Sequence, residues 1–191
     1  RIGKRFLFPG IGYGGSCFPK DVKALAHSAG EVNQEMKILD AVMEVNENQK
    51  TIIVPKVKNY FNNDLRGKKI AIWGLAFKPD TDDIREAPAL YIIDELLAAG
   101  ATVTAYDPEA MDNVSKLLGG KISYGLDEYS LLDGADALII CTEWSLFRTP
   151  DFERMGKLLN NKVIFDGRNL YSLDQPQDAG FSYYSIGRSN V

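Results

Sequence analysis

Apolar residues recur at helical spacing through the first third of the chain. Between residues 20 and 30 they fall three and four positions apart, and Gly30 follows as a typical C-terminal stop, so we expect a short helix there. Residues 33–61 keep the same period without a glycine, which predicts one long helix that bends at Pro55. Such a helix exceeds the average length of about 11 residues, so it needs a surface to pack on, either a second copy of the chain or a bridge between two domains.

Beyond residue 64 the pattern changes to short apolar runs separated by helical segments, which is typical of a parallel, doubly wound sheet. The runs cover residues 69–77, 102–107, 121–125, 135–142 and 162–168. The predicted fold class is therefore α/β, a long central helix followed by a doubly wound, mainly parallel Rossmann-like sheet. Residues 1–64 would hold a loop and the central helices, and residues 65–191 the sheet, whose ligands are expected beyond the carboxyl ends of its strands.

Composition and charge narrow the function classes. The 191 residues carry a net charge of −4, which disfavours binding to nucleic acid. No apolar run approaches the roughly 20 residues that span a bilayer, and the start has no signal-peptide layout, so we expect a cytoplasmic protein without membrane contact. Two cysteines and one histidine leave little for a disulfide framework, a metal site or a Ser-His-Asp triad.

The stretch "IGYGGSCFPKD" at residues 11–21 gathers glycines around one thiol, and glycines let a backbone approach a ligand closely. Pro19 suits the first turn of the following helix, so Cys17 stands at a helix N-terminus with Lys20 close behind, and both effects favour a thiolate. Asp21 opposes the thiolate by its charge, which fits a role in orienting a water or a proton. From these residues alone, a buried structural cysteine in a glycine-rich loop is an equal alternative.

The ends of the predicted strands carry cations. Gly74 has no glycine two or five positions later, so a dinucleotide-binding turn at this strand end is doubtful. Lys78, Arg85 and Arg168 suit phosphates or ribose hydroxyls, although surface charge on a turn is the simpler explanation of each. Cys141 lies inside an apolar run and is explained as a small hydrophobic residue.

Three motifs resemble signatures of the nucleotide-sugar dehydrogenases, in the branch that oxidises UDP-glucose. They are "RIGKRFLFPGIGYGGSCFPKDVKAL", "GLAFKPDTDDIREAPAL" and "FDGRN". Phe18 is closer to this branch than to the relatives that oxidise GDP-mannose. The resemblance implies oxidation of the sugar C6 alcohol to a carboxylate, giving UDP-glucuronate, in two hydride transfers to NAD⁺. A cysteine would hold the intermediate first as a thiohemiacetal and then as a thioester.

The resemblance also implies roles for individual residues. Cys17 would be the nucleophile, Asp21 would help to activate the hydrolytic water, and Lys20 would lie near the nicotinamide. Arg85 would reach the NAD phosphates, and Arg1 would enter the neighbouring subunit's sugar site. The residues expected around the nucleotide-sugar are Arg1, Phe6, Leu7, Gly10, Tyr13, Gly14, Phe77, Lys78 and Arg168.

Members of this family begin with a separate NAD-binding domain bearing a G-x-G-x-x-G turn, which these 191 residues do not contain. We therefore expect a portion of a larger enzyme, inactive by itself and dimeric through the central helix. The alternatives are a dehydrogenase for GDP-mannose or another nucleotide-sugar, and a non-catalytic nucleotide-binding module or redox-sensing thiol. A glycosyltransferase or epimerase is less favoured, since neither chemistry calls for a cysteine in a glycine cradle.

Overall fold

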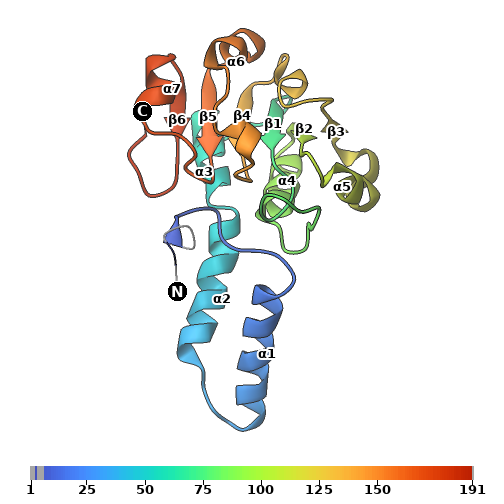
Figure 1. Ribbon diagram of the computed structural model, residues 1–191, viewed down its shortest axis with the longest axis vertical. Coiled ribbons are helices and arrows are strands. Elements are labelled where there is room, and N and C mark those ends of the chain that lie inside the picture. Colours follow the sequence, from blue (N-terminus) through green and yellow to red (C-terminus); the bar gives the residue numbers. More distant parts are fainter. Residues whose placement is uncertain (1–2, 4–6, 191) are drawn as a thin grey trace.

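A helical hairpin and an α/β sheet make up the chain in the computed structural model, which describes residue 3 and residues 7–190 (Figure 1). The hairpin consists of α1 (Phe18–Glu31) and α2 (Lys37–Lys50), and α3 (Ile53–Tyr60) leads from it into the sheet. Among the described residues, no helix is both long and apolar enough to cross a membrane.

Six parallel strands form the sheet, in the order β3-β2-β1-β4-β5-β6. The strands are β1 (Lys69–Trp73), β2 (Thr102–Tyr106), β3 (Ser123–Tyr124), β4 (Ala137–Ile140), β5 (Val163–Asp166) and β6 (Ser182–Tyr184). The prediction of a doubly wound, mainly parallel sheet is confirmed, and the order reverses between β1 and β4. The sixth strand, β6, was not predicted.

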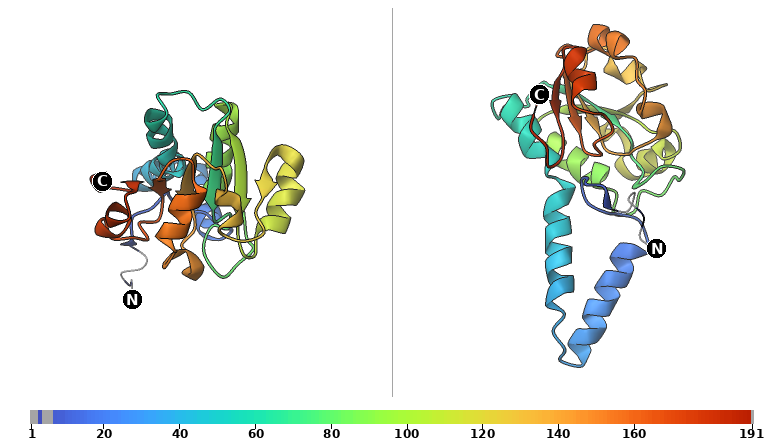
Figure 2. Two further views of the ribbon diagram at one scale, coloured as in Figure 1. Left: turned by 90° about the horizontal axis from the view of Figure 1, so that it is seen from above. Right: turned by 60° about the vertical axis from the view of Figure 1, so that its left-hand side comes forward.

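Successive side chains of the inner strands enter two cores on opposite faces of the sheet. In β1, Ile70 and Ile72 pack in one core, while Ala71 and Trp73 pack in the other. The first core is covered by α3, α4 (Pro88–Ala98) and α5 (Met111–Leu118), and the second by α6 (Phe152–Leu158) and short 3₁₀ turns (Figure 2). Both isoleucines are fully buried, and each such side chain contributes about 1.5–3 kcal/mol.

The prediction of one long helix bent at Pro55 is wrong. The helix is interrupted at Thr51 and Ile52, and Pro55 lies in the first turn of α3. A proline ring clashes with the carbonyl four residues earlier, which here belongs to Thr51, so the interruption precedes the proline by one turn. At 1.5 Å per residue, α2 is about 21 Å long, roughly half the length that one continuous helix would have.

The predicted stop of the first helix is also wrong. Gly30 lies inside α1, which begins at Phe18 and ends at Glu31. The left-handed residue after the helix is Asn33, with φ of 54°. Asparagine tolerates this conformation better than other residues with a side chain, so it ends the helix in place of the glycine.

The helix α3 belongs to the sheet by its packing. Ile53, Val54 and Val57 are almost completely buried in the same core as Ile70. By contrast, α2 buries only Asn46 and Lys50 within this chain. The division into residues 1–64 and 65–191 stays a prediction.

Candidate functional site

The glycine-rich loop before α1 crosses the carboxyl ends of the strands (Figure 1). At one end, the Ile11 amide donates to the Gly167 carbonyl just after β5, at 3.1 Å. At the other, the Gly15 amide donates to the Arg85 carbonyl at 2.7 Å, in the segment that follows β1. The loop therefore joins two strand exits, where ligands bind in sheets of this kind.

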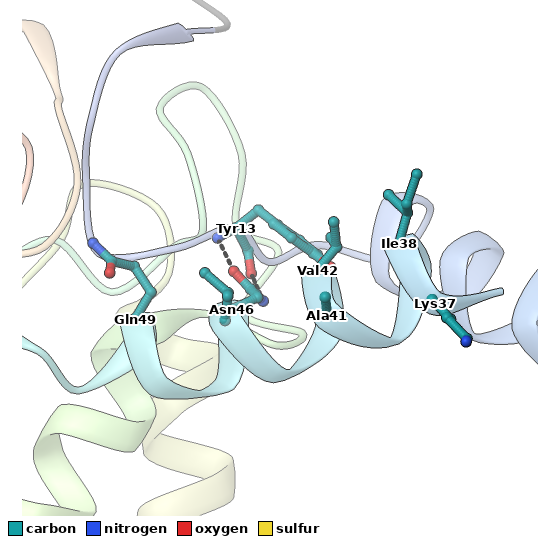
Figure 3. Close-up of a pocket in the computed structure, with 8 residues that line it drawn as sticks. Tyr13, Lys37, Ile38, Ala41, Val42, Asn46 and Gln49 are labelled. Atoms are coloured by element: carbon teal, nitrogen blue, oxygen red, sulfur yellow. Dashed lines mark hydrogen bonds between the residues drawn. The ribbon is translucent and has the colours of Figure 1, made fainter.

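Two side chains of α2 hold the loop from below. Asn46 accepts a hydrogen bond from the Tyr13 amide at 2.8 Å and donates to the Tyr13 carbonyl at 3.1 Å, as Figure 3 shows. Gln49 donates to the Gly10 carbonyl at 2.6 Å. The sequence interpretation missed both residues. The available signal was the polar run "NENQK" at the end of a helix with apolar residues.

The loop glycines permit close contact with the rest of the protein. A Cβ on Gly14 would stand 2.2 Å from the Glu86 carbonyl oxygen, and one on Gly15 would stand 2.7 Å from the Phe77 ring. A Cβ on Gly10 would stand 2.9 Å from the Arg168 guanidinium. The glycines are therefore needed for the loop to pack against the rest of the protein. The close approach of these glycines to a ligand stays a prediction.

Cys17 is the N-cap residue of α1, with Pro19 in the first turn as expected. Its side chain is exposed, so the alternative of a buried structural cysteine is wrong. The Asp21 amide donates to the Cys17 carbonyl at 2.9 Å, and the two side chains are one helical turn apart on the same face. Lys20 and Asp21 are both exposed and their charged atoms are 3.4 Å apart. The thiol is therefore an exposed side chain at the N-terminus of a helix, one turn before a carboxylate.

Arg85 and Phe77 lie beside the Cys17 end of the loop. The Arg85 guanidinium makes two hydrogen bonds of 2.9 Å to Asp83, which raise the pKa of Arg85, and the nearby Cys17 contributes to the same increase. Lys78 is exposed, with its Nζ 5.3 Å from the Phe77 ring centre. Cys17, Phe77 and Arg85 therefore share one end of the site.

Arg168 lies at the other end of the loop. Its guanidinium binds Glu143 through two contacts, Nε to Oε2 at 2.7 Å and Nη2 to Oε1 at 2.8 Å. Gly10 packs directly against it. Leu7 is 71% exposed. The predicted site residues Arg1 and Phe6 lie outside the described residues.

The exit of β1 is filled by the protein itself. Asp107, fully buried after β2, accepts hydrogen bonds from the Leu75 and Ala76 amides at 2.7 and 3.0 Å, and from the Trp144 indole at 3.0 Å. A Cβ on Gly74 would stand 2.4 Å from the Thr142 Cβ. In a dinucleotide fold this turn cradles the pyrophosphate and an acidic residue binds the ribose. Here Thr142 packs against the turn at Gly74, and Asp107 already accepts hydrogen bonds from the protein.

Cys141 is buried after β4, and burial raises the pKa of its thiol, which agrees with its interpretation as a small hydrophobic residue. In the described part of the chain, no three His, Cys, Asp or Glu side chains are grouped to hold a metal ion.

The chain is similar to proteins of known family in sequence and in fold. The chain is 45% identical over 188 residues to the UDP-glucose 6-dehydrogenase of Rhizobium meliloti (strain 1021), covering 98% of this chain and 43% of the relative. It is also 45% identical over 191 residues to UDP-glucose 6-dehydrogenase TuaD of Bacillus subtilis (strain 168), covering 100% of this chain and 41% of the relative. A solved UDP-glucose dehydrogenase from Pyrobaculum islandicum superposes with a TM-score of 0.84 at 34% identity, over 99% of this chain and 41% of that one.

The chain thus spans less than half the length of these relatives. Residues 1–48 match the central domain of the UDP-glucose/GDP-mannose dehydrogenase family. Residues 71–173 match the UDP binding domain of the same family. On this sequence match and the shared fold, the chain belongs to the UDP-glucose/GDP-mannose dehydrogenase family.

Proposed function

We propose that these residues form the central and C-terminal portion of an NAD-dependent dehydrogenase that oxidises UDP-glucose to UDP-glucuronate. The observation that carries the proposal is the loop of residues 10–17, which seats an exposed Cys17 at a helix N-terminus and rests on Arg168 and Arg85 at two strand exits. The nucleotide-sugar would lie along this loop. Its uracil and ribose would reach Arg168, and its sugar would extend toward Cys17.

The chemistry assigned to this chain is covalent capture. NAD⁺ supplies the hydride acceptor for both oxidations. The Cys17 sulfur adds to the C6 aldehyde and forms a carbon–sulfur bond, while the aldehyde oxygen takes up a proton, giving a thiohemiacetal. Oxidation of the thiohemiacetal gives a thioester, and water then breaks the carbon–sulfur bond to release the carboxylate and the thiol. Asp21, one turn after Cys17, would accept a proton from that water.

NAD does not fit the sheet of this chain in the usual way, because the β1 exit is closed and Asp107 is already bonded. Lys20 and Arg85 are exposed and are the residues of this chain that would contact NAD. The main NAD site would therefore belong to a domain outside these residues, and the chain alone would not turn over. The relatives, more than twice as long as this chain, support that view.

The first test uses the complete enzyme. Cys17→Ser should abolish formation of UDP-glucuronate while leaving UDP-glucose binding within about twofold, since it removes the nucleophile and little volume. Asp21→Asn should slow hydrolysis, so that mass spectrometry detects a sugar adduct on Cys17. Near-normal turnover by Cys17→Ser would refute the assignment.

The second test uses the 191-residue chain and calorimetry. The chain should bind UDP or UDP-glucose more tightly than NAD⁺. Arg168→Met should weaken UDP binding by about tenfold or more, because it removes a charge-assisted contact. The exposed Arg148→Met serves as the matched control. Tighter binding of NAD⁺ than of UDP would mean that the sheet is assigned to the wrong ligand.

A related dehydrogenase acting on GDP-mannose is the nearest alternative, since the family includes both substrates. Competition between UDP and GDP in the same calorimetric experiment separates the two. A redox sensor remains the alternative from another class. Cys141 is buried and Cys17 exposed, so this pair offers no accessible resolving thiol for it.

We also propose a homodimer through α2. One side of this helix carries an apolar groove of about 510 Å³ beside Tyr13, in which Ile38 is 80% and Val45 64% exposed (Figure 3). A second copy is the proposed occupant, because the groove continues the side of α2 that already holds the cysteine loop. Val45→Glu should produce a monomer in analytical ultracentrifugation, whereas Leu126→Glu, at the 93% exposed Leu126, should not. We propose the cytoplasm as the site of action.

A further inference from the structure

A cluster of charged side chains lies directly behind the cysteine loop. Lys50, the last residue of α2, has a side chain that is 1% exposed, and its Nζ lies 2.6 Å from Glu86 Oε2 and 2.9 Å from Glu47 Oε1. The Tyr91 hydroxyl of α4 donates to the same Glu86 oxygen at 2.7 Å. Lys23 of α1 lies 3.3 Å from the other Glu86 oxygen. Glu86 therefore connects three helices.

The pairing keeps both central groups charged. Burial alone would lower the pKa of Lys50, but hydrogen bonds to Glu86 and Glu47 raise it above its ordinary value. The hydrogen bonds from Lys50 and Tyr91 lower the pKa of Glu86 to about 2. A buried ammonium is stable only with such partners, so loss of either charge would disrupt the cluster.

The backbone at Glu86 is unusual and touches the loop. Its φ is 52°, a left-handed conformation that a residue with a side chain adopts only when its surroundings enforce it. The Glu86 carbonyl faces Gly14 so closely that no Cβ fits, and the preceding Arg85 carbonyl accepts the Gly15 amide. Residues 85–86 thus form the surface on which the loop is laid just before Cys17.

We propose that Lys50 and Glu86 are a positioning pair for Cys17. Their ion pair fixes the left-handed backbone at residue 86, this backbone fixes Gly14 and Gly15, and the loop then sets the place of the thiol. Both carboxylate oxygens of Glu86 already accept bonds from Lys50, Lys23 and Tyr91. Because these bonds already engage the carboxylate, the pair acts on Cys17 through the loop and not by direct contact. The inference rests on the proposed role of Cys17.

Hydrogen exchange in the 191-residue chain tests the structural part. Glu86→Gln keeps the shape but removes the charge, and the Tyr13 and Gly15 amides should exchange about tenfold faster or more. The matched control is Glu95→Gln in α4, the helix that begins two residues after Glu86, which removes an exposed ion pair with Lys58 at 3.2 Å. The control should leave both amides within about twofold. Exchange in Glu86→Gln no faster than in the control overturns the proposal.

Kinetics of the complete enzyme test the link to Cys17. Glu86→Gln should lower kcat by about tenfold or more and leave KM for UDP-glucose within about twofold, and Lys50→Arg should restore most of the rate lost in Lys50→Met. Tyr91→Phe removes one donor and gives a milder form of the same effect if Glu86→Gln fails to fold. A loss of kcat without faster exchange overturns the positioning role. Failure of the proposed function would appear separately. The Cys17→Ser enzyme would then stay active, while the Tyr13 and Gly15 amides would still exchange faster in Glu86→Gln.

Discussion

Gly14→Ala is the sharpest test of the loop geometry. The backbone of Gly14 is outside the left-handed region, so alanine brings no conformational strain and only the contact of the new Cβ matters. That Cβ would stand 2.2 Å from the carbonyl oxygen and 2.8 Å from the carbonyl carbon of Glu86, both main-chain atoms that cannot rotate away. Real Cβ contacts stay beyond 3.0 Å, so the loop or residues 86–87 must move by about 1 Å.

The movement occurs three residues before Cys17. A misplacement of about 1 Å can cost about 100-fold in rate, so we expect a loss of kcat of that order in the complete enzyme. Overpacking should also lower the free energy of unfolding by about 1–3 kcal/mol. NADH formation measures the first effect and urea unfolding of the 191-residue chain the second. A folded Gly14→Ala enzyme that keeps kcat within about threefold would refute the reasoning.

Three further predictions concern stability, each measured by urea unfolding of the chain. Gly30→Ala, in open space inside α1, should stabilise by about 0.5–1 kcal/mol without changing kcat, and a loss would contradict the helical assignment of Gly30. Asp107→Asn points an amide at two backbone donors, whichever oxygen it replaces, and should lower the free energy of unfolding by about 4 kcal/mol, while the exposed Asp133→Asn changes it by about 0.5 kcal/mol or less. Glu86 ionises well below its usual pKa of 4.5, so its contribution, on the order of 2 kcal/mol, is complete above pH 4.5 and is lost as the pH falls toward 2. Glu86→Gln should flatten that part of the stability profile, and an unchanged slope between pH 5 and 3 would contradict the ion pair.

The sheet could be predicted because each inner strand is buried on both faces and reads as an apolar run. Residues 69–77 and 135–142 contain β1 and β4 as expected, although each strand is shorter than its run because the apolar residues continue into buried turns. The last strand, β6, was missed because it has only three residues and lies on the edge of the sheet. Three residues are too few to show the alternation that identifies a strand.

The helices show what periodicity cannot resolve. The apolar period runs unbroken from α2 into α3, yet the first part packs on little within this chain and the second enters the core of the sheet. The same spacing therefore serves two different neighbours. A local pattern reports that a face is apolar, but it does not report what covers it.

The two ends of the candidate site could be predicted from the sequence, but the residues that hold the loop between them could not. Cys17 and Arg168 stand out by residue type and position in their motifs, and the structure brings the loop from one to the other. Asn46 and Glu86 were missed because their partners lie far away in the sequence, Tyr13 for the first and Lys50 for the second. A polar residue in a helix or a turn indicates only that some partner exists.

The loop gives the proposed reaction a fixed geometry. Its Gly10 end rests on Arg168, and its Gly15 end is bonded to Arg85, with Asn46 holding Tyr13 between them. Under the proposed function, the grip on the nucleotide and the position of the thiol are set by the same short segment. Binding energy from the distant nucleotide can then orient the sugar C6 toward the thiol, and this use of remote contacts to promote the reacting step raises kcat more than affinity.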